Sequence, residues 1–168
     1  MMMCSDPRSE TEEREAVVQA AWGWLGTPYH PCGRVRGVNG GADCLTVVVG
    51  AYEEAGLIPP QEIQAYSQEW HLHRNEEKYL NGVLQYARQL PAGELPKPGD
   101  LVLWKFGRCF SHGAIVVKWP RIIHAYMGRN CTLENAETSR WLMTIGEGTG
   151  EQVGRVRPRK FFTLWPRG

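Results

Sequence analysis

The apolar pattern changes its period near the middle of the chain, and this change constrains the fold more than any other feature of the sequence. Before about residue 90, apolar side chains recur at the spacing of amphipathic helices. A turn-rich segment with Pro91, Gly93, Pro96, Pro98 and Gly99 follows, and beyond it short apolar runs alternate with turns, as in antiparallel hairpins. Helices followed by a meandering sheet predict an α+β fold.

The first predicted helix covers residues 9–25. Ser9 and Glu12 have the spacing of a capping box, in which the two side chains bind free backbone amides at a helix start. Gly26 is expected to end the helix, because glycine is common just past the last turn. The apolar face that should be buried consists of Ala16, Val17, Ala20, Ala21, Trp24 and Leu25.

Two more helices are predicted before the turn-rich segment. Asp43 can cap a helix that starts at Cys44 and ends at Gly56, after a glycine-rich loop over residues 27–42. Residues 57–74 form a connector without a clear pattern. Asn75 is the expected cap of the next helix, whose buried face would hold Tyr79, Leu80, Val83, Leu84 and Ala87.

The second half of the chain predicts short strands joined by turns. Their spacing favours antiparallel pairing, and the sequence shows no internal repeat. The expected strands are Leu101–Phe106, His112–Lys118, Ile122–Tyr126, Thr132–Asn135 and Arg155–Leu164.

Length and composition limit the possible functions. The 168 residues suit a single domain over 1–168, with residues 1–8 as a flexible N-terminus. A formal net charge of +1 lacks the basic excess of a nucleic-acid binder, so no nucleic-acid partner is expected. No apolar run approaches the roughly 20 residues of a membrane span. The polar N-terminus has no secretion signal, which predicts synthesis in the cytoplasm.

Five cysteines are present, at positions 4, 32, 44, 109 and 131. An odd number and wide spacings argue against a disulfide framework, and the absence of a C-x-x-C pair argues against a structural zinc site. Cys44 stands out because it follows a glycine-rich loop and opens a predicted helix. Backbone amides at a helix start favour a thiolate, the nucleophilic form of cysteine, although packing alone also explains a single buried cysteine.

A nucleophilic cysteine needs a base, and the base needs an orienting partner. His112 opens one predicted strand and His124 lies in the next. Adjacent antiparallel strands can bring the two imidazoles within hydrogen-bond reach on one face of the sheet, so that His124 fixes the orientation of His112. His71 and His73 lie in the connector and are expected to be exposed.

Five segments of the chain resemble the NlpC family of papain-like cell-wall cysteine peptidases, in particular a branch found in phage tails. They occur in the family's order over about three quarters of the chain, which is far more specific than any single motif. The segments are Trp24-Leu25-Gly26-Thr27-Pro28-Tyr29, Asp43-Cys44, Pro98-Gly99-Asp100-Leu101-Val102-Leu103-Trp104, Ser111-His112-Gly113-Ala114-Ile115-Val116-Val117 and Ile123-His124-Ala125.

The resemblance implies roles for four residues. Cys44 would be the nucleophile, His112 the general base and His124 the polar third member, while Tyr29 would line the site and help bind the oxyanion. The implied substrate is a peptidoglycan stem peptide, no cofactor or metal is implied, and the implied fold is papain-like α+β. The family commonly has Ser-Gly after Asp-Cys, whereas Leu45 and Thr46 stand here; the phage-tail branch accepts Leu at the first of these positions.

The missing secretion signal raises the question of delivery. The resemblance points to transport in a phage tail or virion, with phage tail proteins as partners, and release by lysis or action on recycled wall peptides inside the cell are the alternatives. Arg34 and Arg36, in the loop ahead of Cys44, are candidates for pairing with substrate carboxylates, although two solvated arginines explain them as well.

Other functions remain open from the sequence. The same residues could support acyl transfer or cleavage of an amide outside the wall. A catalytically inert tail component with this fold is another reading, against which the complete set of Cys44, His112 and His124 argues. A metal-binding module is a further possibility, with a candidate ligand set of His30, Cys32, Cys44, His112 and His124.

Overall fold

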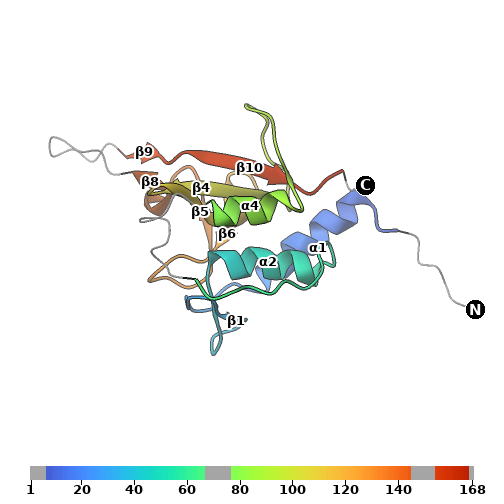
Figure 1. Ribbon diagram of the computed structural model, residues 1–168, viewed down its shortest axis with the longest axis horizontal. Helices are drawn as coiled ribbons and strands as arrows, with labels where there is room; N and C mark the ends of the chain where they lie inside the picture. Colours follow the sequence, from blue (N-terminus) through green and yellow to red (C-terminus); the bar gives the residue numbers. More distant parts are fainter. Residues whose placement is uncertain (1–6, 67–76, 145–153, 167–168) are drawn as a thin grey trace, which may run out of the picture.

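The computed structural model describes residues 7–66, 77–144 and 154–166. Its elements, labelled as in Figure 1, are α1 (Glu10–Trp22), β1 (Arg34–Val35), β2 (Gly41–Ala42), α2 (Cys44–Glu54), α4 (Lys78–Leu84), β3 (Arg88–Gln89), β4 (Leu101–Phe106), β5 (Cys109–Lys118), β6 (Arg121–His124), β7 (Thr132–Asn135), η1 (Arg140–Leu142), β8 (Met143–Thr144), β9 (Arg155–Val156) and β10 (Arg159–Thr163).

The strands form an antiparallel sheet and the helices gather on one side of it. Within the described residues, β3, β10, β4, β5, β6 and β7 pair in that order, so the β4–β5–β6–β7 part is a meander. In Figure 1, α1 and α2 lie together beside the sheet, and α1, α2 and α4 each contact β5. The predicted α+β fold is therefore confirmed.

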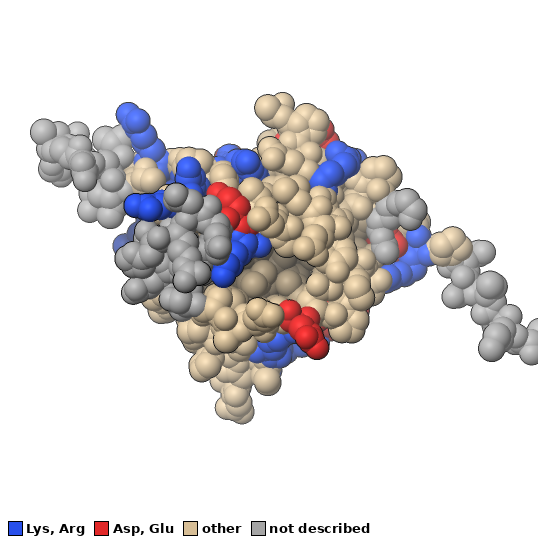
Figure 2. Space-filling model, viewed as in Figure 1, with Lys and Arg blue, Asp and Glu red and all other residues tan. Residues whose placement is uncertain are grey.

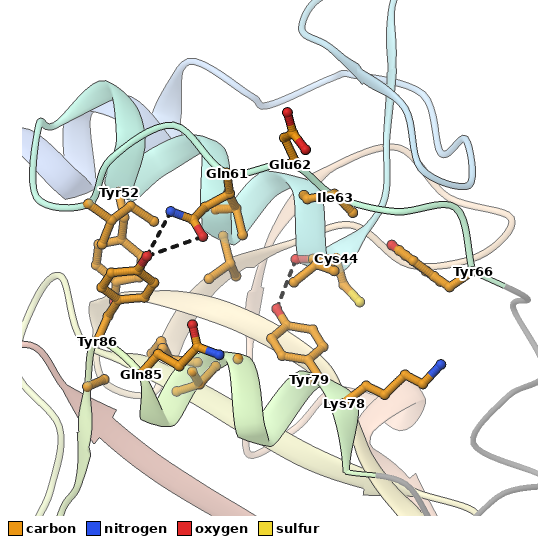
Figure 3. Close-up of a pocket in the computed structure, with 18 of the residues that line it drawn as sticks. Cys44, Tyr52, Gln61, Glu62, Ile63, Tyr66, Lys78, Tyr79, Gln85 and Tyr86 are labelled. Carbon is orange, nitrogen blue, oxygen red and sulfur yellow. Dashed lines mark hydrogen bonds between the residues drawn. The ribbon is translucent and has the colours of Figure 1, made fainter.

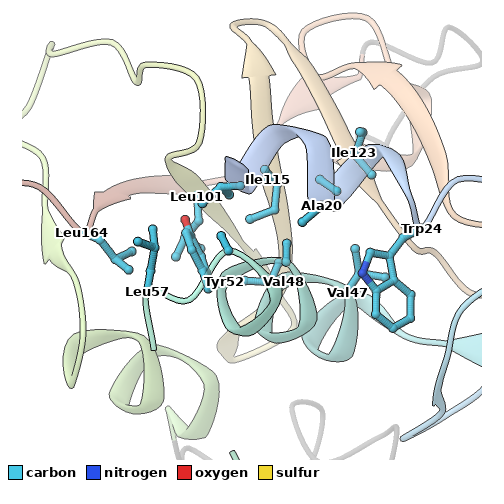
Figure 4. Packing of buried hydrophobic residues seen from close by; sticks show 14 of the residues in the cluster. Ala20, Trp24, Val47, Val48, Tyr52, Leu57, Leu101, Ile115, Ile123 and Leu164 are labelled. Atoms are coloured by element: carbon cyan, nitrogen blue, oxygen red, sulfur yellow. The ribbon is translucent and has the colours of Figure 1, made fainter. Parts of the chain in front are cut away.

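The main core fills the space between the helices and the sheet. Leu101 and Ile115 from neighbouring strands pack against Val48 and Tyr52 of α2 and Ala20 of α1 (Figure 4). The alternate strand residues point to the opposite face of the sheet. There they form a second cluster with residues that follow β7, consisting of Val102, Trp104, Ala114, Val116, Ile122, Ala136 and Leu142.

The first helix begins as predicted but ends earlier than expected. Ser9 and Glu12 form the reciprocal capping box, and Val17, Ala20, Ala21 and Trp24 are buried. The helix stops at Trp22 because the chain tightens into turns, in which Trp24 donates to the Ala21 carbonyl oxygen. Gly26, the predicted end, has a φ of 81° and lies at the end of these turns.

The second helix matches its prediction and the third matches it in part. Asp43 caps α2 in a reciprocal capping box with Thr46, and Gly56 follows its end with a φ of 73°. In α4 the cap position is Glu77, and Asn75 lies outside the described residues. Leu84 is half exposed, so its predicted burial was wrong; of the residues in α4, Tyr79 is the buried one.

The predicted strands are present, three of them with altered bounds. One of the three is β6, which covers Arg121–His124 instead of Ile122–Tyr126. Leu101–Phe106 and Thr132–Asn135 agree with β4 and β7, and β5 starts three residues earlier than expected. The last predicted strand is divided into β9 and β10, because Pro158 cannot donate a backbone hydrogen bond between them. The short pairs β1–β2 and β8–β9 were not predicted.

A buried ion pair ties the first helix to the start of the sheet. Asp100, at the head of β4, accepts from Arg14 of α1 at 2.9 Å and from the backbone amide of Lys97 at 2.8 Å. The preceding Gly99 has a φ of 84°, and its carbonyl oxygen accepts from the Tyr52 hydroxyl of α2 at 2.8 Å. The Pro98-Gly99-Asp100 turn thus fixes both helices against the strand that pairs with β5.

Candidate active site

The start of α2 is held by the loop that precedes it. The amide of His30 donates to the Ala42 carbonyl oxygen and the amide of Ala42 donates to the Pro28 carbonyl oxygen, both at 3.0 Å. Tyr29 therefore forms a bridge with Ala42, immediately before the cap residue Asp43. This local pairing places the Tyr29 side chain beside Cys44.

Cys44 is the first residue of α2 and lies against the beginning of β5. Its thiol donates to the backbone carbonyl oxygen of Ser111 at 3.6 Å. Cys44 and His112 line one pocket of about 250 Å³, together with Tyr29, Asp43, Tyr66, Phe106, Ser111, Ala125, Tyr126 and Met127. The sequence reasoning expected Cys44, His112 and Tyr29 near one another, and the structure places all three on this pocket.

The two histidines occupy diagonal positions on β5 and β6. Ile115 of β5 pairs with Ile123 of β6, so His124 lies across from Ala114, two residues from His112 on the same face. His112 Nε2 and His124 Nδ1 are 2.8 Å apart, within a buried hydrogen bond. The predicted contact between the two imidazoles is confirmed, and His124 lies behind His112 as seen from the pocket.

Glu134 of β7 extends this pair and was not identified from the sequence. Its Oε2 lies 3.0 Å from His124 Nε2. Strand β7 pairs with β6 so that Thr132 faces His124, which puts Glu134 at the next diagonal position. Ser139 donates to Oε2 and Arg129 to Oε1, both at 2.7 Å. The side chains thus form the series His112, His124, Glu134.

The surroundings of Cys44 and His112 favour the neutral form of both side chains. Burial lowers the pKa of His112 well below its usual range, and the electrostatic influence of His124 and Arg157 acts in the same direction. Burial raises the pKa of Cys44 to about 12, and the Asp43 carboxylate adds to that increase. The resting pair is therefore a thiol beside a neutral imidazole.

The direction of this pKa shift runs against the expectation of a thiolate at the helix start. The amides of Leu45 and Thr46 donate to Asp43 Oδ1 at 3.1 and 3.0 Å, so the cap residue takes up part of the positive potential of the helix. The backbone amides of Gly113, Leu45 and Cys44 still lower the pKa of the thiol, but burial and the neighbouring carboxylate outweigh them. Helix position alone does not decide the ionisation of a cysteine.

The connector contributes a residue that the sequence did not single out. The Tyr66 hydroxyl donates to Asp43 Oδ2, which also accepts from the backbone amide of Cys32 at 2.8 Å. Tyr66 lines the pocket of Cys44 and His112, and burial raises the pKa of its phenol. Residues 57–66 thus run over the helix start, and the rest of the predicted connector, with His71 and His73, lies outside the described residues.

A second pocket of about 320 Å³ adjoins the first at Cys44, Tyr66 and Ser111. It lies between α2, α4 and the connector, and the face shown in Figure 2 is hollowed. Figure 3 shows the Cys44 sulfur directed toward Tyr66 and the Tyr79 hydroxyl directed at the Cys44 carbonyl oxygen, a hydrogen bond of 3.3 Å. Cys44 therefore stands at the junction of the two pockets.

Gly113 allows α4 to reach the nucleophile. A Cβ atom at this position would collide with the hydroxyl of Tyr79, and it would also crowd the side chain of Leu103. Since the same hydroxyl donates to the Cys44 carbonyl oxygen, the glycine after His112 lets β5, α4 and α2 meet at one point. This explains the Ser111-His112-Gly113 sequence in packing terms.

The other candidate residues have different surroundings. Arg34 pairs with Glu53 at 2.6 Å and Arg36 with Glu54 at 2.7 Å, so both arginines bind α2. Among the described residues, no three or more His, Cys, Asp or Glu side chains are arranged to hold a metal ion, and the set that includes His30 and Cys32 is not such a group. Within the same residues no helix is long and apolar enough to cross a membrane.

Replacing Asp43 by Asn should make Cys44 more reactive. Asparagine caps helices about as well as aspartate, whereas the loss of the carboxylate charge removes one cause of the raised thiol pKa. Each pKa unit lost raises the thiolate fraction about tenfold, so we expect alkylation by iodoacetamide at pH 7 to accelerate several-fold, up to about tenfold. Peptide mass spectrometry would follow Cys44 separately from the other cysteines.

The same assay checks the neutral resting state of the wild-type protein. Its Cys44 alkylation rate should still be rising at about pH 10, because the thiol pKa lies above the ordinary value. A rate that reaches a plateau below about pH 8 would instead show the thiolate form. Alkylation of Cys32, which lies beside Asp43 but is not the proposed nucleophile, provides an internal comparison.

Comparison with solved structures shows the class of fold. RipB, a peptidoglycan hydrolase of Mycobacterium tuberculosis, is similar with a TM-score of 0.55 and 18% identity over 94% of this chain and 68% of that one. NlpC1 of Trichomonas vaginalis has a TM-score of 0.53 and 14% identity over 81% of this chain and 43% of that one. The NlpC/p60 domain of the peptidoglycan hydrolase SagA has a TM-score of 0.50 and 20% identity over 74% of this chain and 90% of that one.

These similarities identify an α+β papain-like fold. The chain has the NlpC/p60 form of that fold, as the sequence motifs predicted. Neither the protein-family profiles nor the curated proteins searched give a match by sequence.

Proposed function

We propose that this chain is a cysteine peptidase that cleaves amide bonds of peptidoglycan stem peptides through a thioester. The observation that carries the proposal is one pocket lined by both Cys44 and His112, with His112 hydrogen-bonded to His124. The fold is that of RipB and SagA, which are described as peptidoglycan hydrolases. Membership of the NlpC family and the choice of substrate are part of this proposal.

The reaction begins from the neutral pair. His112 takes the thiol proton of Cys44 as the sulfur attacks the scissile carbonyl carbon, which forms a C–S bond and an oxyanion. The backbone amide of Cys44 and the Tyr29 hydroxyl stabilise that oxyanion. The intermediate collapses when the C–N bond breaks, and protonated His112 gives its proton to the leaving amine.

Water completes the turnover. Neutral His112 takes a proton from a water molecule that attacks the thioester carbonyl, and the C–S bond breaks. The released thiolate receives the proton back from His112, so thiol and imidazole return to their starting forms. The net change is the addition of one water molecule across one amide bond.

Burial makes His112 suitable for this role. A base with a lowered pKa is present in its neutral, proton-accepting form throughout the neutral pH range. The aromatic rings of Phe106 and Tyr126 pack against the imidazole with centroid distances of 5.4 and 5.3 Å and limit its contact with water. The thiol loses its proton only as the attack occurs.

Incubation of the purified chain with stem peptides released from peptidoglycan tests the proposal. Mass spectrometry should detect two fragments whose masses sum to the substrate plus one water molecule. Addition of hydroxylamine should divert part of the acyl group into a hydroxamate, which is the mark of a thioester intermediate. Intact peptides after prolonged incubation, with Cys44 still reactive toward iodoacetamide, would refute the choice of substrate.

Delivery by a phage tail belongs to the same proposal and is supported by the motif resemblance. Under it, phage tail proteins are partners of the chain, which is made in the cytoplasm and carried out with the particle. Mass spectrometry of purified phage particles would test this, and absence of the chain from them would contradict it.

A further inference from the structure

A continuous line of hydrogen bonds connects the pocket to a carboxylate at the edge of the sheet. His112 Nε2 contacts His124 Nδ1 at 2.8 Å, and His124 Nε2 contacts Glu134 Oε2 at 3.0 Å. Each imidazole thus uses one named nitrogen for its neighbour. The nitrogen of His112 that remains for the thiol is Nδ1.

Glu134 is held as a carboxylate at the end of this line. The hydrogen bond with His124 lowers its pKa most, and Ser139 and the positive charge of Arg129 act in the same direction against the effect of burial. An ionised carboxylate has no proton to give and accepts hydrogen bonds only. His124 Nε2 must therefore carry a hydrogen that it donates to Glu134.

The hydrogen that His124 donates to Glu134 determines which atom donates in the hydrogen bond between His124 and His112. In neutral His124 a hydrogen on Nε2 leaves a lone pair on Nδ1, which must then accept from His112 Nε2. A neutral His112 with its hydrogen on Nε2 has its lone pair on Nδ1. If His124 carried hydrogens on both nitrogens, the hydrogen of neutral His112 would instead lie on Nδ1, where it could not accept the thiol proton.

We propose that Glu134 is a positioning residue that fixes the tautomers of His124 and His112, and thereby directs the basic lone pair of His112 Nδ1 to Cys44. Glu134 acts through the two histidines and does not touch the substrate. The inference rests on the proposed function for its catalytic meaning, while the proton positions that it requires are a property of the protein alone.

The alternative role of Glu134 is that of a surface ion pair with Arg129. The burial of the partners argues against this as its main role, because the His124 side chain is 1% exposed and that of Glu134 14%, whereas that of Arg129 is 42% exposed. Two groups, His124 and Ser139, also share the inner oxygen Oε2. The outer oxygen binds Arg129, which steadies the carboxylate from the solvent side.

Nuclear magnetic resonance of the full chain labelled with ¹⁵N-histidine tests the proton positions without a substrate. Long-range ¹⁵N–¹H spectra distinguish a protonated nitrogen from one with a lone pair. We expect hydrogens on Nε2 of both His112 and His124 at neutral pH. A hydrogen on Nδ1 of His112 in the resting protein would overturn the inference.

The variant Glu134→Gln tests the cause of this arrangement. Its amide is similar in size but can either donate or accept toward His124, so the direction of the line is no longer fixed and both tautomers of His112 should appear. We expect kcat on a cleaved stem peptide to fall roughly 10- to 100-fold with KM changed less than about twofold. Unchanged tautomers together with unchanged kcat would refute the role.

Matched variants distinguish an effect on the histidine tautomers from a general loss of folding. Glu137→Gln makes the same chemical change at an exposed glutamate that pairs with Arg159, and it should leave the histidine spectra and kcat as in the wild type. Glu134→Asp keeps the charge and should preserve the tautomers better than the glutamine variant. If Glu134→Gln does not fold, the wild-type spectrum and the Glu134→Asp variant still test whether Glu134 fixes the histidine tautomers.

The outcomes also separate this inference from the proposed function. A protein with the expected tautomers that cleaves no stem peptide would keep the inference on proton positions and remove the proposed substrate. A protein that cleaves stem peptides with His112 protonated at Nδ1 would keep the function and remove the inference.

Discussion

Replacing Cys44 by Ala is expected to reduce hydrolysis of stem peptides by at least about 10³-fold, to a rate that product analysis cannot detect. The substitution removes the atom proposed to form the acyl-enzyme, and the hydroxyl of Ser111, which also lines the pocket, is a much weaker nucleophile than a thiol. Fragment yields measured by mass spectrometry, with the same peptide and incubation time as for the wild type, check this result.

The fold should survive this change. The hydrogen bond from the thiol to the Ser111 carbonyl oxygen is long, at 3.6 Å, and alanine is compatible with the first turn of a helix. We expect the midpoint of thermal unfolding to shift by a few degrees, which corresponds to about 1 kcal/mol. The Asp43 cap, which holds the helix start, is untouched.

Cys131→Ala is the matched control. Cys131 is a buried cysteine outside both pockets, with a backbone amide that donates to Thr27, so its loss should affect stability and leave the hydrolysis rate in place. Turnover by Cys44→Ala at the wild-type rate would contradict the assignment of the nucleophile. An equal loss of activity in both variants would point to general destabilisation instead.

His112→Gln is expected to lower kcat by about 10²- to 10⁴-fold. A glutamine amide can donate to His124 Nδ1 but has no lone pair of comparable basicity for the thiol proton. Because the resting thiol is protonated, attack cannot begin without a base, and raising the pH should restore part of the lost rate. Steady-state kinetics on a stem peptide between about pH 6 and 10 would measure both effects.

His30→Gln provides the comparison for this second variant. His30 is exposed on the loop before Cys44 and its Nδ1 contacts the Pro31 carbonyl oxygen, away from the His112–His124 pair. The same substitution there should leave kcat within about twofold of the wild type. If His112→Gln kept full activity at neutral pH, a group other than His112 would have to serve as the base.

The sequence predicted the site where local signals were strong. Asp43 and Cys44 followed from a helix-capping pattern, and their positions were confirmed because a cap depends on only a few neighbouring residues. His112 and His124 followed from two apolar strands with a short turn between them. Adjacent antiparallel strands left little freedom in their pairing, so the contact between the imidazoles could be predicted.

Other features depended on details that no local pattern contains. Glu134 lies in a strand of mixed polarity, and its contact with His124 requires the register between β6 and β7. Tyr66 comes from a connector without periodicity, so its approach to Asp43 had no signal at all. Leu84 satisfied the helical spacing but is 50% exposed, because spacing alone does not show whether another element covers that part of the helix.

The raised pKa of Cys44 also bears on the oxidation of its sulfur. Oxidants attack thiolates much faster than thiols, and oxidation to sulfinic acid is in general irreversible. A raised thiol pKa therefore slows oxidation of Cys44 while no substrate is bound.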